Sequence, residues 1–354
     1  MLEMHEPPKR GLLDRPTAPE HLEREIASDF GLMATQPLVE IGGSSTLNLH
    51  LETTDGSFVV RLYRRWMTPA RLNAMQTARR HLAGVGIPCP PPVHVRDGNG
   101  WMAIDGYLVE IEPLIGYDSK MDSWVRLEQG LPMLGRIHDR LASLDVPMEG
   151  RIAPASNSID REHFVQGVRA GARILRDIHP PDIELAVADE SEVLADRIAT
   201  LERPLDLGPH QLVHGDYWDN NVYFRNGRIV LVLDLDFMAA RPRIDDLALT
   251  LYYTNSTFSE DQVSGKRIRQ LGRLVHAYNS ALARPLSDDE WQAIPLAMAR
   301  TAVGFLSHFP YADSEEGMHS LARELIPDFA WVRALLDDLE RWQQVTRQPL
   351  ASAQ

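Results

Sequence analysis

The sequence contains a single cysteine, Cys89, in 354 residues. One thiol excludes an internal disulfide, and we expect Cys89 to be a small, buried or half-buried hydrophobic side chain. The sequence also lacks an apolar run long enough to cross a bilayer, and no apolar signal segment occurs at its start. These absences predict a soluble protein of the cytoplasm that has no membrane partner.

Positive charge is scarce, because 36 lysines and arginines stand against 50 aspartates and glutamates, for a formal net charge of −14. This excess of negative charge argues against nucleic acid or an anionic membrane as a partner, and it suits a cationic or zwitterionic substrate. Acidic residues are nevertheless absent between Asp55 and Asp97, an interval that holds seven arginines. Positive charge is therefore concentrated in one part of the chain.

The length of 354 residues exceeds that of one compact core, so we expect two lobes. Strand signals dominate the first part of the chain, and helical periodicity dominates the rest. The sequence predicts an α+β protein with a small, mostly antiparallel β N-lobe at 19–112 and a larger, mainly helical C-lobe at 113–354. Residues 1–18 are rich in proline and charge, and we expect them to form a loose tail.

Three strand patterns follow one another in the predicted N-lobe, at 38–41, 49–53 and 57–63. The loop between the first two contains Gly43, Ser44 and Ser45, whose small side chains would let backbone N–H groups approach phosphates. The third strand carries Arg61, and a guanidinium pairs well with phosphate oxygens. The alternative is that Arg61 is an outward-facing surface arginine.

The strongest local signal is Asn226-Gly227 between two apolar runs, which predicts a β-hairpin with a type I′ turn. Folding there would bring Asn221, just before the first arm, close to Asp234, just after the second. Asp216 lies in the loop that precedes the first arm. Two carboxylates and a carboxamide are therefore expected to converge at the open end of the hairpin.

These polar groups suit phosphoryl transfer. Mg²⁺ prefers oxygen ligands, and an amide oxygen with a carboxylate is an ordinary protein contribution that phosphates and water complete. An aspartate kept off the metal can accept the proton of an attacking hydroxyl. The order of Asp216, Asn221 and Asp234 parallels the catalytic and metal-binding residues of protein kinases. The alternative is a hairpin with three solvated polar residues.

The segments HGDYWDNNVYF and VLDLDFMAARPRIDDLA resemble the signature of the aminoglycoside phosphotransferase-like kinase superfamily. This superfamily includes homoserine kinases, choline kinases and antibiotic kinases, and residues 277–306 resemble the C-terminal helices of bacterial homoserine kinases. The resemblance covers residues 31–343, and it implies a bilobal, protein-kinase-like fold.

The resemblance also implies a role for each residue of the motif. Asp216 would be the catalytic base, Asn221 and Asp234 would be magnesium ligands, and Asp236 would be a further helper at the metal. Asp246 would hydrogen-bond the backbone of the catalytic loop rather than touch the substrate. The residues implied to bind ATP, or GTP in its place, are Gly43, Ser44, Ser45, Arg61, Glu110 and Ile111. The last two would bind adenine through the backbone of the strand and hinge between the lobes.

Two histidines are expected to be structural. His214 would pack under the catalytic loop, and His138 lies on a buried helical pattern, where a core histidine is expected rather than a ligand.

The sequence departs from the protein-kinase pattern in the helix that Thr68-Pro69 is predicted to begin. In protein kinases this helix supplies a glutamate that steadies the strand cation. Here it contains no acidic residue. Either Gln76 or a carboxylate from elsewhere takes that place, or Arg61 needs no partner.

The leading hypothesis is an enzyme that uses ATP and Mg²⁺ to phosphorylate a hydroxyl of a small amine-bearing metabolite, homoserine-like or of the aminoglycoside type. The alternative is a nucleotide-binding pseudokinase that acts as a regulator, because Arg61 replaces lysine and the helix glutamate is missing. A protein-kinase role is disfavoured, because residues 239–245 leave no room for a long activation segment before Asp246.

Overall fold

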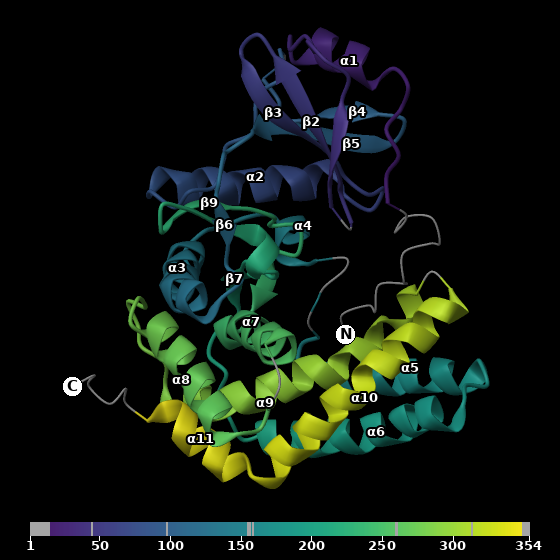
Figure 1. Ribbon diagram of the computed structural model, residues 1–354, viewed down its shortest axis with the longest axis vertical. Helices are drawn as coiled ribbons and strands as arrows, with labels where there is room; N and C mark the ends of the chain where they lie inside the picture. The colour runs from purple at the N-terminus through teal and green to yellow at the C-terminus, as the bar shows by residue number, and fades with distance from the viewer. Residues whose placement is uncertain are drawn as a thin grey trace. The chain divides into compact units, whose positions relative to one another are not determined.

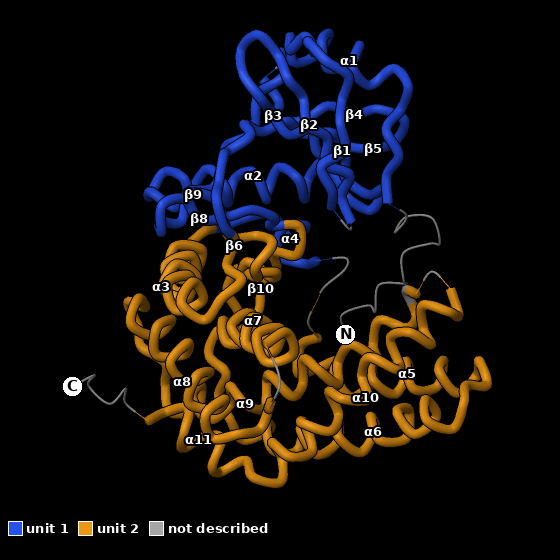
Figure 2. Tube along the Cα trace, in the orientation of Figure 1, with its two compact units in different colours: residues 1–119, 145–154, 223–235 blue, residues 120–144, 155–222, 236–354 orange. Residues whose placement is uncertain are grey.

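The computed structural model describes residues 15–43, 45–96, 98–153, 157, 159–258, 261–312 and 314–348. The chain divides into two compact units (Figure 2). Unit 1 takes its residues from 1–119, 145–154 and 223–235, and unit 2 takes its residues from 120–144, 155–222 and 236–354. The first division follows Ser119, whereas the sequence predicts a boundary at Pro113, and two later segments of the chain return to unit 1.

Unit 1 is built on a five-stranded sheet in the order β1-β2-β3-β5-β4, with every neighbouring pair antiparallel. Its elements are α1 (Leu22–Asp29), β1 (Val39–Gly42), β2 (Leu47–Thr53), β3 (Gly56–Leu62), α2 (Pro69–Gly84), β4 (Met102–Ile104), β5 (Tyr107–Pro113) and α4 (Met148–Arg151). This sheet confirms the small antiparallel β part that the sequence predicts.

The two faces of this sheet differ in polarity, because side chains alternate along each strand. Val60 of β3 and Ile111 of β5 belong to an apolar cluster that includes Leu22 and Ile26 of α1. Glu110 of β5 points to the other face, where its carboxylate is bonded to side chains of α2. The sheet of unit 1 therefore lies between α1 and α2, with apolar packing on one side and polar contacts on the other (Figure 1).

Helix α2 begins where the sequence predicts it. The Thr68 hydroxyl accepts a hydrogen bond from the backbone N–H of Arg71 at 3.2 Å, and Pro69 occupies the first helical position. The buried guanidinium of Arg71 donates to the carbonyl oxygens of Glu149 at 3.0 Å and Ile152 at 2.7 Å. These bonds tie α2 to the short helix α4.

The predicted hairpin is confirmed as β8 (Val222–Arg225) and β9 (Arg228–Val232), and β6 (Ser119–Lys120) adds a third strand beside β8. Asn226 has φ 51° and Gly227 has φ 71°, as a type I′ turn requires. The carboxylate of Asp118 accepts a hydrogen bond from the backbone N–H of Asn226 at 2.8 Å. The tip of the hairpin is therefore held by a contact from outside it.

Unit 2 is mainly helical, as predicted for the second part of the chain. Its elements are α3 (Trp124–Leu141), α5 (Phe164–Asp177), α6 (Asp182–Glu202), β7 (Gln211–Val213), η1 (Asp219–Asn221), β10 (Ala239–Arg241), α7 (Arg243–Thr257), α8 (Gly265–Asn279), α9 (Asp288–Gly304), η2 (Phe305–Tyr311), α10 (Glu315–Asp337) and α11 (Leu339–Arg347). Strands β7 and β10 form an antiparallel pair, and the loop that contains Asp216 follows β7.

The expectation for the single cysteine agrees with the structure. Cys89 is buried, and burial raises the pKa of its thiol to about 12, so it acts as a small hydrophobic side chain. Within the described ranges, no helix combines the length and the apolar character needed to cross a membrane.

The contact between α5 and η2 depends on a glycine, and this generates a prediction about stability. A Cβ at Gly171 of α5 would lie 1.9 Å from the carbonyl oxygen of Leu306 in η2, so Gly171→Ala must push the two elements apart. We expect a loss of about 1–3 kcal/mol in the free energy of unfolding, measured by urea denaturation. Gly317→Ala in α10 is the matched control, because a Cβ there meets only Ser314 Oγ at 3.4 Å. Equal effects of the two substitutions would contradict the packing argument.

Candidate active site

The loop that follows β7 turns sharply at a glycine. Gly215 has φ +85°, and a Cβ there would lie 2.2 Å from the carbonyl oxygen of Phe237. Only glycine meets both demands at this position. The turn at Gly215 therefore places the half-buried Asp216 shortly after the buried strand β7.

A buried carboxylate holds this turn. Asp246 of α7 accepts hydrogen bonds from the backbone N–H groups of His214 at 2.9 Å and Gly215 at 3.0 Å, and it contacts His138 Nε2 at 2.9 Å. Burial by itself would raise the pKa of the Asp246 carboxyl, but the hydrogen bond and charge of His138, helped by His214 and Gly215, bring this pKa below its usual range. The predicted structural role of Asp246 is confirmed.

His138 and His214 occupy core positions, as the sequence predicts. His138 is fully buried on α3, and its Nδ1 lies 2.7 Å from the hydroxyl of Tyr278. His214 is fully buried as well, and its Nδ1 accepts a hydrogen bond from the backbone N–H of Asp216 at 3.3 Å. His214 bonds the loop backbone directly, and His138 supports the loop through Asp246.

Two further hydrogen bonds fix the loop beyond Asp216. The hydroxyl of Tyr217 donates to the carbonyl oxygen of Gly130 on α3 at 2.8 Å. The hydroxyl of Thr250 on α7 donates to the carbonyl oxygen of Tyr217 at 2.7 Å. The loop is therefore bonded to α3 on one side and to α7 on the other.

The Asp216 carboxylate is oriented by two amides. Asn221 Nδ2 donates to Asp216 Oδ2 at 2.9 Å and to the Asp216 carbonyl oxygen at 2.8 Å. Asn157 Nδ2 donates to Asp216 Oδ1 at 2.8 Å. Each carboxylate oxygen thus accepts a hydrogen bond from a side-chain amide.

Asn157 escaped prediction from the sequence. It lies in the polar stretch between α4 and α5, where no motif or periodic pattern distinguishes one polar residue from its neighbours. Its contact with Asp216 depends on the fold of unit 2, so only the structure identifies it.

Asp234 lies in unit 1, two residues beyond β9, and has φ +66°. Positive φ is uncommon outside glycine, although aspartate tolerates it better than most residues, and such positions are frequent at functional sites. Asp234 Oδ1 lies 3.6 Å from a guanidinium nitrogen of Arg61, whose side chain is only 6 % exposed. The structure thus joins two predicted site residues of unit 1 and excludes a surface position for Arg61.

The loop between β1 and β2 places Gly43 and Ser45, whereas Ser44 lies outside the described residues. Gly43 has φ +101°, and a Cβ there would lie 2.1 Å from the carbonyl oxygen of Thr46. The Gly43 carbonyl oxygen accepts a hydrogen bond from Arg15 Nε at 2.8 Å, and that of Ser45 accepts one from Arg64 Nε at 2.9 Å. Arginines thus bind the carbonyl side of this loop.

Glu110 and Ile111 lie inside β5 and are fully buried. The Ile111 carbonyl oxygen accepts a hydrogen bond from the backbone N–H of Val93 at 2.7 Å, and both residues pair with β3. The Glu110 side chain contacts α2. The implied binding of adenine to this backbone stays a prediction.

Asp236 is 2 % exposed and belongs to unit 2, whereas Asp234 belongs to unit 1. The chain therefore passes from one unit to the other between the two aspartates. Among the residues that the structure describes, no group of three or more His, Cys, Asp or Glu side chains could hold a metal ion by itself. A magnesium ion on these side chains needs phosphate oxygens and water as further ligands.

Tyr253 is close enough to Asp216 to be affected by its charge, and two further aromatic rings of unit 2 lie near Tyr253. The rings of Trp218 and Tyr253 lie 5.5 Å apart, and those of Tyr253 and Phe305 lie 6.4 Å apart, measured between centroids. Burial, and then the charge of Asp216, raise the pKa of the Tyr253 hydroxyl. All three rings are half-buried, so part of each remains accessible.

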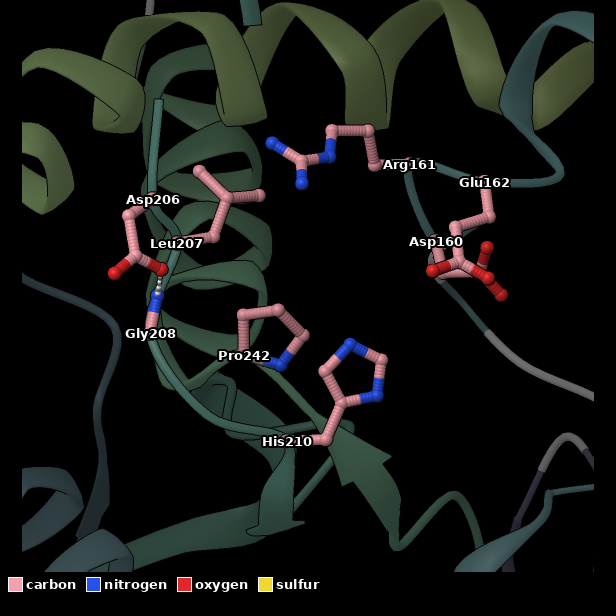
Figure 3. Close-up of a pocket in the computed structure, with 8 residues that line it drawn as sticks. All are labelled: Asp160, Arg161, Glu162, Asp206, Leu207, Gly208, His210 and Pro242. Atoms are coloured by element: carbon pink, nitrogen blue, oxygen red, sulfur yellow. Dashed lines mark hydrogen bonds between the residues drawn. The ribbon is translucent and has the colours of Figure 1, made fainter. Parts of the chain in front are cut away.

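A hollow elsewhere in unit 2 contains none of the predicted site residues. It is lined by Asp160, Arg161, Glu162, Asp206, Leu207, Gly208, His210 and Pro242 (Figure 3). The Arg161 guanidinium donates to the carbonyl oxygens of Glu202 at 3.2 Å and Leu205 at 2.8 Å. Part of its hydrogen-bonding capacity is therefore used by the backbone.

Known proteins resemble this chain in sequence. The phosphotransferase enzyme family, APH, matches residues 38–291. A homoserine kinase of Gluconacetobacter diazotrophicus is 27% identical over 293 residues, which cover 79% of this chain and 85% of the relative. A homoserine kinase of Mesorhizobium japonicum is 28% identical over 268 residues, which cover 75% of this chain and 77% of the relative.

Solved structures resemble it in fold. An aminopropanol kinase associated with a microcompartment superimposes with a TM-score of 0.72 at 14% identity, covering 91% of this chain and 98% of the other. An amicoumacin kinase in complex with AMP-PNP, Ca²⁺ and its antibiotic gives a TM-score of 0.64 at 16% identity, with coverage of 87% and 92%. These likenesses confirm the protein-kinase-like fold.

The chain belongs to the APH phosphotransferase enzyme family, because the family match spans most of its length. It is a small-molecule kinase that phosphorylates a hydroxyl.

The Asp246 contacts generate a prediction about pH and stability. We expect Asp246→Asn to lower the free energy of unfolding by about 1–3 kcal/mol near neutral pH, because an amide cannot accept all the hydrogen bonds that the buried carboxylate makes with His138, His214 and Gly215. Since the folded pKa of Asp246 lies below the unfolded value of about 3.9, this stabilisation is complete above that value and is lost as pH falls through the folded pKa.

Urea denaturation of both proteins from about pH 7 to about pH 3 checks this prediction, and the gap between them should narrow at the acid end. Asp182→Asn, at an exposed position in α6, is the control and should shift stability by less than about 0.5 kcal/mol. A gap that stayed constant with pH would contradict the role given to the Asp246 charge.

Proposed function

We propose that this kinase transfers the γ-phosphate of ATP, in the presence of Mg²⁺, to a hydroxyl of a small amine-bearing molecule. The acceptor is a homoserine-like amino alcohol or an aminoglycoside-type antibiotic. The observation that carries the proposal is the Asp216 carboxylate, oriented by Asn157 and Asn221 on a loop that Asp246 holds. The homoserine kinase and amino-alcohol or antibiotic kinase relatives support this acceptor class.

Asp216 acts as the general base. Its two oxygens are held at fixed positions by amide donors, and a carboxylate so oriented can accept the proton of an incoming hydroxyl. Aligning the hydroxyl with the phosphate is the larger part of this task, because phosphoryl transfer depends mainly on positioning and on stabilising charge.

Asn221 and Asp234 bind the metal, and Asp236 assists. The amide nitrogen of Asn221 is engaged by Asp216, which leaves its amide oxygen as the atom to face a cation. Carboxylate and amide oxygens are the ligands that Mg²⁺ accepts, and phosphates and water complete the sphere. When bound, the metal neutralises charge on the β- and γ-phosphates.

Arg61 binds the phosphates of the nucleotide, with help from the backbone N–H groups of Gly43, Ser44 and Ser45. Its buried position supports this assignment, because a guanidinium shielded from water attracts phosphate oxygens more strongly than a solvated one does. We assign the adenine to the backbone of Glu110 and Ile111, and GTP remains an alternative nucleotide.

The amine of the acceptor lies against the aromatic rings near Asp216. A cation over a tyrosine or tryptophan face is stabilised by the ring quadrupole, and the net charge of −14 favours a cationic ligand. The half-buried faces of Trp218, Tyr253 and Phe305 supply such contacts.

Substituting each aspartate separates binding from chemistry. Asp234→Asn should abolish turnover and weaken the magnesium-dependent binding of ATP. Asp216→Asn should leave the affinity for MgATP nearly intact and lower kcat by about 10²–10⁴-fold, the usual contribution of a general base. Turnover is measured as ADP release over a panel of homoserine, other amino alcohols, choline and aminoglycosides.

Two outcomes would count against the proposal. Full activity of Asp234→Asn together with loss of MgATP binding in Asp216→Asn would reverse the assigned roles. Magnesium-dependent nucleotide binding without turnover on any member of the panel would favour a pseudokinase.

The aromatic contact predicts the behaviour of Tyr253 variants. Tyr253→Leu removes the ring and should raise KM for an amine acceptor on the order of tenfold, while KM for ATP stays the same. Tyr253→Phe keeps the ring and should retain most of the affinity for the acceptor. Steady-state kinetics with each substrate varied in turn measures both constants, and equal effects of the two substitutions would exclude a contact between the ring and the amine.

A further inference from the structure

One polar layer in unit 1 lies between the sheet and α2, on the face opposite the apolar cluster. Arg61 of β3 stands directly across from Glu110 of β5 in the antiparallel register. Directly opposed residues of an antiparallel pair share a face, with Cβ atoms about 4.5–5.5 Å apart. Side chains two residues apart in extended chain point to the same face. Glu112 of β5 therefore lies on the same face as Glu110, and Tyr63, the first residue after β3, lies on the same face as Arg61.

The contacts in this layer converge on Glu110. Its Oε2 accepts a hydrogen bond from Gln76 Nε2 at 2.6 Å, and its Oε1 accepts one from the hydroxyl of Tyr63 at 3.3 Å and another from the Arg79 guanidinium. Arg79 also donates to Glu112 Oε2 at 2.5 Å. Glu110 is 0 % exposed and Glu112 is 2 % exposed, so these are buried charges.

The charges of this layer are inverted relative to the protein-kinase arrangement. There the strand carries the cation and the facing helix carries the carboxylate. Here α2 contributes a cation, Arg79, and an amide, Gln76, while the carboxylates come from the neighbouring strand. Burial raises the pKa of the Glu112 carboxyl, and the charges of Arg79 and Arg61 act in the opposite direction.

We propose that Glu110 is a positioning residue for Arg61, and that the pair of strands β3 and β5 replaces the strand–helix ion pair of protein kinases. This inference rests on the proposed function of Arg61 as a phosphate ligand. Glu110 lies opposite Arg61 in the sheet, and the Arg61 guanidinium carbon lies 5.4 Å from the ring centre of Tyr63, which itself donates to Glu110. Arg79 and Gln76 hold Glu110 in place from the other side.

This arrangement has a consequence for regulation. In protein kinases, movement of the helix breaks the ion pair and switches the enzyme off. Here the carboxylate proposed to position Arg61 lies on the neighbouring strand of the same sheet, so the hydrogen-bonded register keeps Glu110 opposite Arg61. A displacement of α2 would change the contacts of Glu110 but would leave Glu110 opposite Arg61.

A double-mutant cycle tests the inference. The affinities of Arg61→Gln, Glu110→Gln and the combined variant for MgATP and for adenosine are measured by isothermal titration calorimetry. We expect Glu110→Gln to weaken MgATP binding on the order of tenfold. Adenosine binding should stay unchanged, because adenosine has no phosphates and the contact proposed for adenine is made by the backbone of Glu110, which the substitution keeps. In the Arg61→Gln background, Glu110→Gln should cause no further loss, because its effect passes through Arg61.

The other possible outcomes distinguish an error in the role proposed for Arg61 from an error in the role proposed for Glu110. If Arg61→Gln leaves MgATP binding unchanged, the assigned role of Arg61 is wrong, and the inference about Glu110 is wrong with it. If Arg61→Gln weakens MgATP binding but Glu110→Gln acts equally in both backgrounds, or weakens adenosine to the same extent, the positioning role of Glu110 is overturned while that of Arg61 stands.

Two further variants protect the test against a loss of folding. Arg79→Gln combined with Glu110→Gln and Glu112→Gln removes the buried charges that pair with one another, which is often tolerated, and should show the same selective loss of MgATP binding. Glu290→Gln is the matched control in unit 2, where Glu290 is 2 % exposed and pairs with Arg243 at 2.7 Å. A selective loss of MgATP binding in this control would overturn the inference.

Discussion

The contact between Asp246 and the catalytic loop is the constraint on which the site in unit 2 depends. The turn at Gly215 directs two backbone N–H groups into the protein interior, and buried N–H groups need acceptors. A carboxylate accepts both of them and still bonds His138. Because His138 lies on α3 and Asp246 on α7, a single carboxylate fixes the loop relative to both helices, and the position of Asp216 follows.

Unit 1 also contains a buried carboxylate that accepts hydrogen bonds from several elements, but its partners are different. Glu110 is also a fully buried carboxylate that gathers donors from separate elements, and its partners are Arg79, Gln76 and Tyr63. In both units the buried charge is offset by a cation or by several hydrogen bonds, as burial in a low-dielectric interior requires. In both units the buried carboxylate is proposed to fix the position of another side chain, Asp216 in unit 2 and Arg61 in unit 1, which we propose to contact substrate or nucleotide.

The sequence predicts features that are local in the chain and leaves unpredicted those that depend on distant contacts. The hairpin turn at Asn226 follows from one dipeptide, and the start of α2 follows from Thr68-Pro69. Helices α10 and α11 meet at Asp338, and the sequence does not predict this break because no proline or glycine marks it. Neither Asn157 nor the inverted charges around Glu110 follow from a motif, since their partners come from other parts of the chain.

The residues proposed for phosphoryl transfer mostly lie close together in the sequence, whereas those proposed to determine the acceptor lie far apart. The groups proposed for phosphoryl transfer come mostly from one stretch of chain, so a local sequence motif contains most of them. The groups around Asp216 that would meet an acceptor come from widely spaced residues, among them Asn157, Tyr253 and Phe305. Such residues can change one at a time while Asp246 and Gly215 keep the loop in place. This separation explains how relatives with one fold can carry the names of several different acceptors.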